Sequence, residues 1–298
     1  GDLNNAIKAI DYAIEHKVNV ISASWGAAVP RTTAQPLIDA IARAEKAGIV
    51  FVVAASNDGQ NNDSYEVYPA NAGLTNTISV AASNSGDTKP SWSNYGKVKV
   101  QLASPGDGIM STLPGDKYGN LSGTSMATPL VAGLVALVKA QDATLTPMQV
   151  RSVLQATGDK VAIQTQCDCR INAANAIDAI KAHKLMISPF AATYQKRDKV
   201  QFEAAYGKAP LTFTSSTTAV ATIDATGAFV AVSNGTTTIS VKDATGATAT
   251  SYYINVADLA ATPDDPGTPG LPDQCPIDNP QICQMACQFM PTLPWCKN

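Results

Sequence analysis

The sequence predicts an α/β chain with a doubly wound, mostly parallel sheet, followed by a small all-β unit and a short Cys-rich tail. Three observations predict this organisation. Helical and strand patterns alternate over residues 1–183, as in doubly wound folds. Residues 184–257 are rich in β-branched residues and turns, and four of the six cysteines lie in residues 275–298. Residues 258–274 form a Pro/Gly-rich linker between these two parts.

The first helices and strands follow from the spacing of apolar residues. Apolar positions three and four apart predict a helix over Leu3–Lys17, which leads into a strand over Val18–Ser24. A second helix is expected over Ala34–Ala47, stopped by Gly48, and the unbroken apolar run Ile49–Ala55 follows it. Such a run is typical of a parallel strand buried on both faces.

Later elements are marked mainly by caps and breaks. Strands are expected around Thr77–Ala82 and over Val98–Ala103. A helix begins at the N-cap Thr146, with proline next, and stops at Gly158. Asn172 could cap the last helix of this region.

The segment GTSMATPLVAG (Gly123–Gly133) places Ser125 between small residues at the start of an apolar helix. Free backbone N–H groups at a helix N-terminus favour developing negative charge, so Ser125 is a candidate nucleophile. Taken alone, Thr124 or Ser125 could simply cap the helix, which is a common role for these residue types.

GTSMATP resembles the signature around the active-site serine of the subtilisin-like serine proteases, the subtilases. Further blocks follow in the order of that family: SWG, GIVFVVAASNDG, VYPA, WSNYG and SPG. The resemblance covers about Asp2–Ala182 and corresponds to the C-terminal half of the family's catalytic domain. It implies a secreted, extracellular bacterial endopeptidase that acts on protein or peptide substrates.

The resemblance also implies residue roles. Ser125 would attack the scissile carbonyl, and the Asn57 side chain with the Ser125 backbone N–H would hold the oxyanion. Asn57 can alternatively be read as a turn residue in Asn-Asp-Gly. The residues implied to contact substrate are Ser24, Trp25, Gly26, Ala54, Ala55, Ser56, Tyr68, Pro69, Ala70 and Thr124.

Two positions depart from the family pattern. Ser56 stands where the family usually has glycine before the asparagine, which could narrow the pocket for the residue before the cut. Leu130 replaces a histidine at a non-catalytic position. Because the pocket walls carry small and aromatic side chains without a charge, we expect cleavage after medium-sized or apolar residues.

A serine nucleophile needs a base, and the sequence contains only His16 and His183. Each lies near the end of an amphipathic helix, where an imidazole has an ordinary structural role through the helix dipole. Neither matches a catalytic position of the family, in which Asp and His motifs precede the serine. We therefore expect the upstream half of the protease as a partner, either a cleaved chain or a missing segment, and an inactive isolated chain.

Composition excludes some function classes. A net charge of −3 gives no electrostatic footprint for nucleic acid. The longest apolar stretch, LVAGLVALVKA, is too short to span a membrane.

Peptide-bond hydrolysis by a serine nucleophile requires no cofactor. Structural calcium often stabilises the family, and the Ala70–Thr75 loop matches a region that can carry a weak site, but it has no carboxylate cluster, so the metal stays unknown.

In the β-rich region, SSTTAVATIDATGAFVAVSNGTTTISV resembles bacterial Ig-like group 2 domains and implies a small Ig-like sandwich over 184–257. Such a unit could be a spacer, or it could bind a cell surface, a polysaccharide or a protein. The alternative function is therefore a catalytically inactive, protease-derived binding or adhesion protein that uses this module.

The tail is too short for a core of its own, so disulfides are its expected support. Zinc is the alternative, although the tail lacks paired C-x-x-C knuckles. Cys167 and Cys169 flank Asp168, and we expect them to be too close for an easy mutual bridge, so that they are free or pair elsewhere. The cysteines of the expected tail disulfides are Cys275, Cys283, Cys287 and Cys296.

Overall fold

The computed structural model describes residues 2–258. The expected tail disulfides among Cys275, Cys283, Cys287 and Cys296, and almost all of the expected linker, lie outside the described residues.

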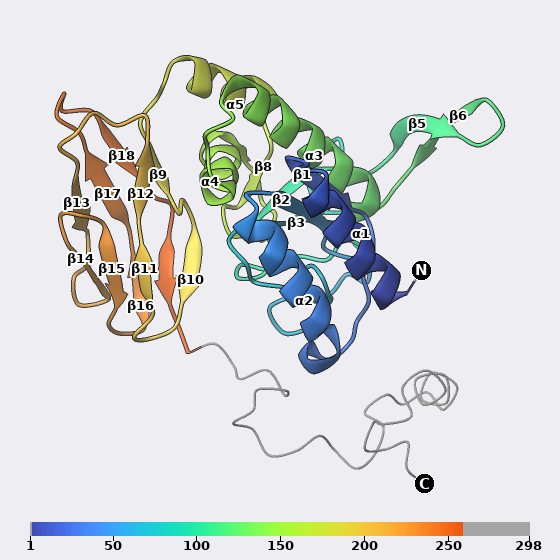
Figure 1. Cartoon of the computed structure of the whole chain (residues 1–298), viewed down its shortest axis with the longest axis horizontal. Coiled ribbons are helices and arrows are strands. Elements are labelled where there is room, and N and C mark those ends of the chain that lie inside the picture. Colours follow the sequence, from blue (N-terminus) through green and yellow to red (C-terminus); the bar gives the residue numbers. More distant parts are fainter. Residues whose placement is uncertain (1, 259–298) are drawn as a thin grey trace, which may run out of the picture.

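A six-stranded sheet organises the N-terminal unit, with the strand order β1-β2-β3-β4-β8-β7 (Figure 1). Strands β1 to β4 run parallel with continuous registers, β4 and β8 share one parallel pair, and β7 and β8 are antiparallel. The strands of this sheet are β1 (Val20–Ala23), β2 (Val50–Ala54), β3 (Thr77–Ser83), β4 (Leu102–Pro105), β7 (Asp159–Lys160) and β8 (Cys169–Arg170).

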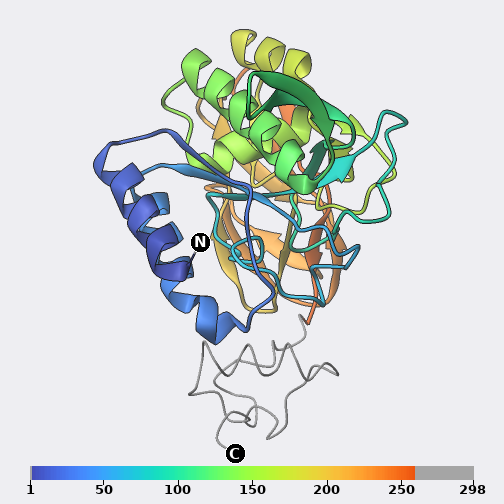
Figure 2. The ribbon, with the colours of Figure 1, turned by 90° about the vertical axis from the view of Figure 1, so that its right-hand side faces the viewer.

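Helices cover both faces of this sheet, as doubly wound topology requires. Val50 and Val52 of β2 pack in the same cluster as α3, α4 and α5, while Phe51 and Val53 pack with α1 and α2. Figure 2 shows the two groups of helices well separated. The helices are α1 (Leu3–Glu15), α2 (Arg31–Lys46), α3 (Thr124–Gln141), α4 (Pro147–Thr157) and α5 (Ala173–Lys181).

The caps expected for the last two helices are present. The Thr146 hydroxyl accepts from the Gln149 N–H at 3.2 Å, and the Gln149 side chain accepts from the Thr146 N–H at 2.9 Å, which completes a capping box. The Asn172 side chain accepts from the Asn175 N–H at 3.0 Å. Local sequence therefore sets these helix starts.

One expected strand begins later than its sequence pattern indicates. The expected strand over Val98–Ala103 starts only at Leu102. The carboxylate of Asp63 accepts the backbone N–H groups of Lys97, Val98 and Lys99 at 2.7 to 2.9 Å. These N–H groups are therefore unavailable to a sheet ladder, and the apolar pattern alone could not reveal this.

A hairpin that the sequence analysis did not anticipate projects from the unit before α3, at the right of Figure 1. Its strands β5 (Ile109–Leu113) and β6 (Lys117–Leu121) pair around a Pro-Gly-Asp turn. Such a turn between two short strands was the available signal. Met110 and Tyr118 on it are 63% and 74% exposed.

The chain after α5 forms an all-β unit with a single core. Four small groups of strands surround buried Phe202, Phe213 and Phe229, and all their pairs are antiparallel except the parallel pair β10–β19. The strands are β9 (Met186–Ser188), β10 (Ala192–Tyr194), β11 (Lys199–Gln201), β12 (Glu203–Ala205), β13 (Thr212–Ser215), β14 (Ala221–Ile223), β15 (Ala228–Ala231), β16 (Gly235–Thr237), β17 (Ile239–Lys242), β18 (Thr248–Thr250) and β19 (Ile254–Val256).

The two units are joined by polar contacts as well as by packing of α4 against β9. The buried Ser152 hydroxyl of α4 donates to the Ser188 hydroxyl of β9 at 2.9 Å. The Tyr206 hydroxyl donates to the Asp142 carboxylate at 3.0 Å. Burial, together with this contact to a carboxylate, raises the pKa of Tyr206.

The expectation that Cys167 and Cys169 are too close for an easy mutual bridge, and are free or pair elsewhere, is wrong in this structure. They form a disulfide, with Cα atoms 5.1 Å apart, a separation within the usual range for a disulfide. The intervening Asp168 has a φ of +46°, and this left-handed turn brings the two side chains to the same side. The sequence spacing of two did not reveal that turn.

Candidate active site

Ser125 is the second residue of α3, and its hydroxyl faces the end of β1. The Ser125 hydroxyl donates to the Ser24 carbonyl at 3.3 Å, and the Ser24 hydroxyl donates to the Ser125 carbonyl at 2.9 Å. The N-cap is Gly123, which has no side chain to cap the helix. The first N–H groups of the helix, that of Ser125 included, have no carbonyl in a preceding helical turn.

Asn57, after β2, lies beside the same helix N-terminus. Its side-chain oxygen accepts from the backbone N–H and from the hydroxyl of Thr124, both at 2.9 Å. Thr124 thus orients Asn57 rather than capping α3. Because the amide oxygen is occupied, the amide NH₂ is the end of Asn57 that remains to donate to a ligand.

The two residues come from distant parts of the chain. Asn57 and Thr124 are 67 positions apart, and the parallel order β2-β3-β4 brings the ends of these strands to one edge of the sheet. Donors fixed in this way need no rearrangement when a negative oxygen forms. The site therefore combines the Ser125 hydroxyl with two N–H donors, the Asn57 side-chain amide and the Ser125 backbone N–H.

Ser56, before this asparagine, has a strained backbone. Its φ is +95°, a region that costs a residue with a Cβ about 1–2 kcal/mol and suits glycine. Its hydroxyl donates to the exposed Asp58 carboxylate at 2.7 Å. Strain of this kind is often found at functional sites.

We expect Ser56→Gly to stabilise the chain by about 1 kcal/mol, because glycine adopts this φ without strain. Urea unfolding followed by circular dichroism measures the change. The matched control is Ser111→Gly in β5, where φ is not positive and the loss should be about 0.5–1 kcal/mol. Equal destabilisation by both substitutions would contradict the strain argument.

The remaining residues implied to contact substrate lie in three places: just after Ser24, at the end of β2 and around Tyr68. Ala54 and Ala55 are buried at the end of β2, and Tyr68, followed by the cis-linked Pro69, is buried too. Ala27 and Tyr68 form an antiparallel bridge with both hydrogen bonds at 2.9 Å. A Cβ on Gly26 would lie 3.0 Å from the Tyr68 carbonyl oxygen, so this close approach favours glycine.

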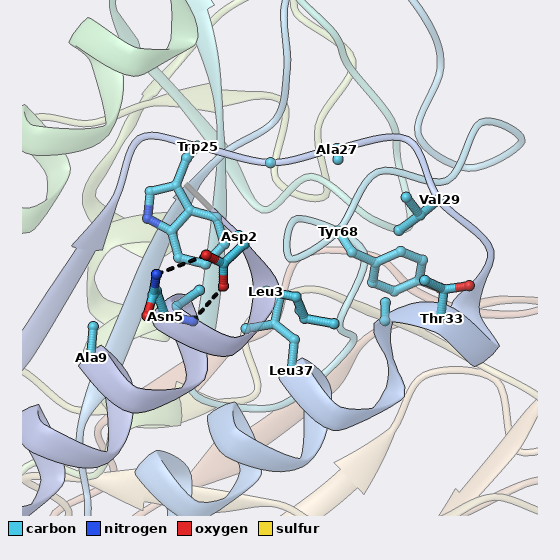
Figure 3. Close-up of a pocket in the computed structure, with 13 residues that line it drawn as sticks. Asp2, Leu3, Asn5, Ala9, Trp25, Ala27, Val29, Thr33, Leu37 and Tyr68 are labelled. Carbon is cyan, nitrogen blue, oxygen red and sulfur yellow. Dashed lines mark hydrogen bonds between the residues drawn. The ribbon is translucent and has the colours of Figure 1, made fainter. Parts of the chain in front are cut away.

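An apolar cavity of about 550 Å³ opens beside Trp25, between α1, α2 and the segment after β1 (Figure 3). Leu3, Val29 and Leu37 provide aliphatic walls, and Tyr68 closes one end. Burial raises the pKa of Tyr68 well above its usual value. Sequence patterns do not reveal this cavity, because its walls come from segments that show separate amphipathic patterns.

The two histidines lie away from these contacts. His16 follows α1, bonds to the Tyr12 carbonyl at 2.9 Å and stacks on the Tyr12 ring. His183 follows α5 and meets the edge of Tyr206. Neither ring hydrogen bonds to Ser125. Among residues 2–258 no group of three or more His, Cys, Asp or Glu side chains could hold a metal ion.

The site thus has a serine at a helix N-terminus, with an asparagine side chain and a strand end beside it, on a doubly wound sheet. This arrangement resembles that of serine hydrolases. The chain belongs to the subtilase family: the model of that family matches residues 1–207. A model of the immunoglobulin-like domain of intimin matches residues 197–245. Within the part that the structure describes, no helix is long and apolar enough to cross a membrane.

Curated relatives are similar over about half of this chain. Subtilisin amylosacchariticus from Bacillus subtilis subsp. amylosacchariticus is 39% identical over 158 residues, 53% of this chain and 40% of its own length. Thermitase from Thermoactinomyces vulgaris is 40% identical over 152 residues, 51% of this chain and 50% of its own. The chain thus matches about half or less of the length of these two relatives.

Solved structures show the same fold. The self-cleaved protease domain of PatA is 27% identical with a TM-score of 0.51, covering 59% of this chain and 67% of that chain. A cold-adapted subtilisin-like serine proteinase is 28% identical with a TM-score of 0.50, covering 58% and 60%. These similarities support a subtilisin-like fold for the α/β unit of this chain.

Proposed function

We propose that this chain carries the nucleophile and oxyanion half of a secreted subtilisin-like serine endopeptidase. The observation that supports this most strongly is the orientation of Asn57 by Thr124, which holds the side-chain oxygen at the start of α3 and leaves the amide NH₂ as the donating end, near Gly123. A binding scaffold has no need for a prepared oxyanion donor beside a serine hydroxyl. An acyl-transfer enzyme needs both.

In this proposal Ser125 Oγ bonds to the carbonyl carbon of the scissile peptide and gives its proton to a base. The carbonyl oxygen becomes an oxyanion, held by the Asn57 amide and the Ser125 N–H. Collapse breaks the C–N bond, and the base returns the proton to the leaving amine. Water then attacks the acyl-Ser125 ester by the same steps and releases the acid. No cofactor enters this chemistry.

The base is proposed to come from outside residues 2–258, on the upstream half of the protease. In the part of the chain that the structure describes, β1 is an edge strand with β2 as its neighbour, so its outer hydrogen-bonding groups are open to another strand. Leu130 and Leu137 of α3 are 42% and 54% exposed. An added strand beside β1 would lie close to the Ser24–Ser125 contact.

The test compares the chain alone with the chain coexpressed with the upstream segment of its gene product. We expect the chain alone to show neither peptide hydrolysis nor rapid labelling by a fluorophosphonate, because the Ser125 hydroxyl stays protonated. The assembled protein should gain both. Hydrolysis by the chain in verified isolation would show that the base has been misassigned.

A second candidate function is binding or adhesion through the β9–β19 unit, with an inactive peptidase unit. The match of residues 197–245 to the intimin immunoglobulin-like model favours it, and we infer an Ig-like sandwich for this unit. An assembled protein that contains Asp and His motifs but leaves Ser125 unlabelled would favour this second function over the enzyme.

For specificity we expect cleavage after medium-sized or apolar residues. Ala54, Ala55 and Tyr68 offer small and aromatic walls, and the Tyr68 hydroxyl stays neutral because burial raises its pKa. The cavity beside Trp25 would accept a second apolar side chain of the same extended substrate. Profiling of the assembled protein on a peptide library measures this preference, and cuts clustered after Lys or Arg would contradict it.

A further inference from the structure

A second cavity, of about 260 Å³, lies where the loop after Pro69 and helix α4 meet strand β10 of the all-β unit. Its lining is rich in donors and contains no aspartate or glutamate. Two of the lining side chains are cationic, Lys99 and Arg151. The neutral polar residues whose side chains could assist them are Gln101, Gln166, Thr193 and Tyr194.

Arg151 is buried without adequate partners. It is 7% exposed, and its Nη1 donates only to the Leu74 and Thr77 carbonyls, both at the long distance of 3.5 Å. Its Nε is buried and has no acceptor among the described residues. A buried guanidinium with so little compensation is costly, and a planar guanidinium favours an oxyanion that accepts two N–H groups.

Lys99 adds a second positive charge. It forms no salt bridge within residues 2–258, and burial lowers the pKa of its ammonium group. The carboxylates whose charge reaches Lys99 are Glu66 and Asp63, and the one that reaches Arg151 is Glu45. Asp63 accepts three backbone N–H groups, Glu45 accepts from Thr75 and Asn76, and none of these three carboxylates lines the cavity.

These residues do not fit the structural calcium that the family resemblance allows for the Ala70–Thr75 loop. Calcium takes six to eight oxygen ligands, usually with carboxylates among them. Here the Leu74 and Thr77 carbonyls face the Arg151 guanidinium, and no carboxylate lines the adjoining cavity. A divalent cation would be repelled by Arg151 and Lys99, so the charge of this site has the wrong sign for calcium.

We propose that this cavity, lined by Arg151 and Lys99, binds a small tetrahedral oxyanion, phosphate or sulfate, against the Arg151 guanidinium. The oxyanion supplies the acceptors that Arg151 lacks. Strand β10 contributes Thr193 and Tyr194 from the other unit. The pKa of Tyr194 is raised to about 12 by burial, so its phenol remains a neutral donor near pH 7. Binding therefore links the peptidase unit to the all-β unit.

The test is isothermal titration of the 298-residue chain with sodium phosphate, and separately with sodium sulfate, against sodium chloride at matched ionic strength. We expect one site per chain and a higher melting temperature with either oxyanion, since a ligand that binds the folded state stabilises it. Lys99→Gln should weaken binding about tenfold or more. Arg151→Gln should weaken it further where that variant folds.

The matched control is Lys117→Gln, on the projecting hairpin, which removes the same charge far from the cavity lining. It should bind the oxyanions as the parent chain does. If Lys99→Gln and Lys117→Gln weakened oxyanion binding equally, the effect would come from the net charge of the chain and not from this cavity, and the proposal would be overturned. Unchanged affinity in Lys99→Gln, or stabilisation by calcium chloride with no response to phosphate or sulfate, would also overturn it. None of these readouts depends on peptidase activity.

Discussion

Ser125→Ala is expected to abolish both fluorophosphonate labelling and peptide hydrolysis in the protein assembled with its base-bearing segment. The substitution removes the only atom that forms the acyl-enzyme bond, while the oxyanion donors and substrate contacts remain. The loss in kcat should approach about 10⁶-fold, a magnitude carried over from subtilisin and not calculated from this structure. Burst kinetics with an activated ester, together with mass spectrometry of the labelled peptide, measure it.

The control for this substitution is Ser122→Ala, three positions earlier. Ser122 donates to the Asp107 carboxylate at 2.7 Å and accepts from the Gly108 N–H, so its loss alters a turn and not the reacting centre. This variant should keep its labelling. Hydrolysis that survives Ser125→Ala at more than trace level would show that another group is the nucleophile.

Asn57→Ala is expected to lower kcat by about 10²–10³-fold with little change in KM, a range established for subtilisin itself. The amide acts on the oxyanion, which exists only after attack, so substrate binding is nearly unaffected. Labelling of Ser125 should persist at a reduced rate. Steady-state kinetics with a peptide substrate separate the two constants.

Thr124→Val tests how Asn57 is oriented. Valine keeps the backbone N–H that donates to the Asn57 amide oxygen but removes the hydroxyl that donates to it at 2.9 Å, so we expect a smaller loss in kcat than for Asn57→Ala. The control is Asn84→Ala, which removes a half-buried turn asparagine whose side chain accepts from the Gly86 and Thr88 N–H groups. If Asn57→Ala raised KM and left kcat unchanged, the oxyanion role would be wrong.

Much of the fold follows from local patterns. The unbroken apolar run that becomes β2 has alternate side chains in two different cores, and a parallel strand covered on both faces requires such a run. Caps at Thr146 and Asn172 start helices through hydrogen bonds within three residues. Signals of this short range are complete in the sequence itself.

Other features depend on contacts between distant residues. The Asp63 carboxylate accepts the backbone N–H groups of Lys97 to Lys99, so these groups cannot pair in a strand. The local apolar pattern does not indicate this contact. The disulfide between Cys167 and Cys169 depends on the left-handed backbone of Asp168. Both features could be recognised only from the backbone geometry, because the same residues are also compatible with a longer strand before β4 and with unbridged cysteines.

The sequence by itself determined the family, the nucleophile Ser125 as a candidate and the alternation of helices and strands, because motifs and periodicity are local properties of the chain. Only the tertiary structure decided that Thr124 holds Asn57 beside Ser125. It alone decided that Arg151 and Lys99 line one cavity without a carboxylate. The partners of a side-chain hydrogen bond and the net charge of a cavity depend on which distant segments pack together. Tertiary packing determines this, and local sequence does not.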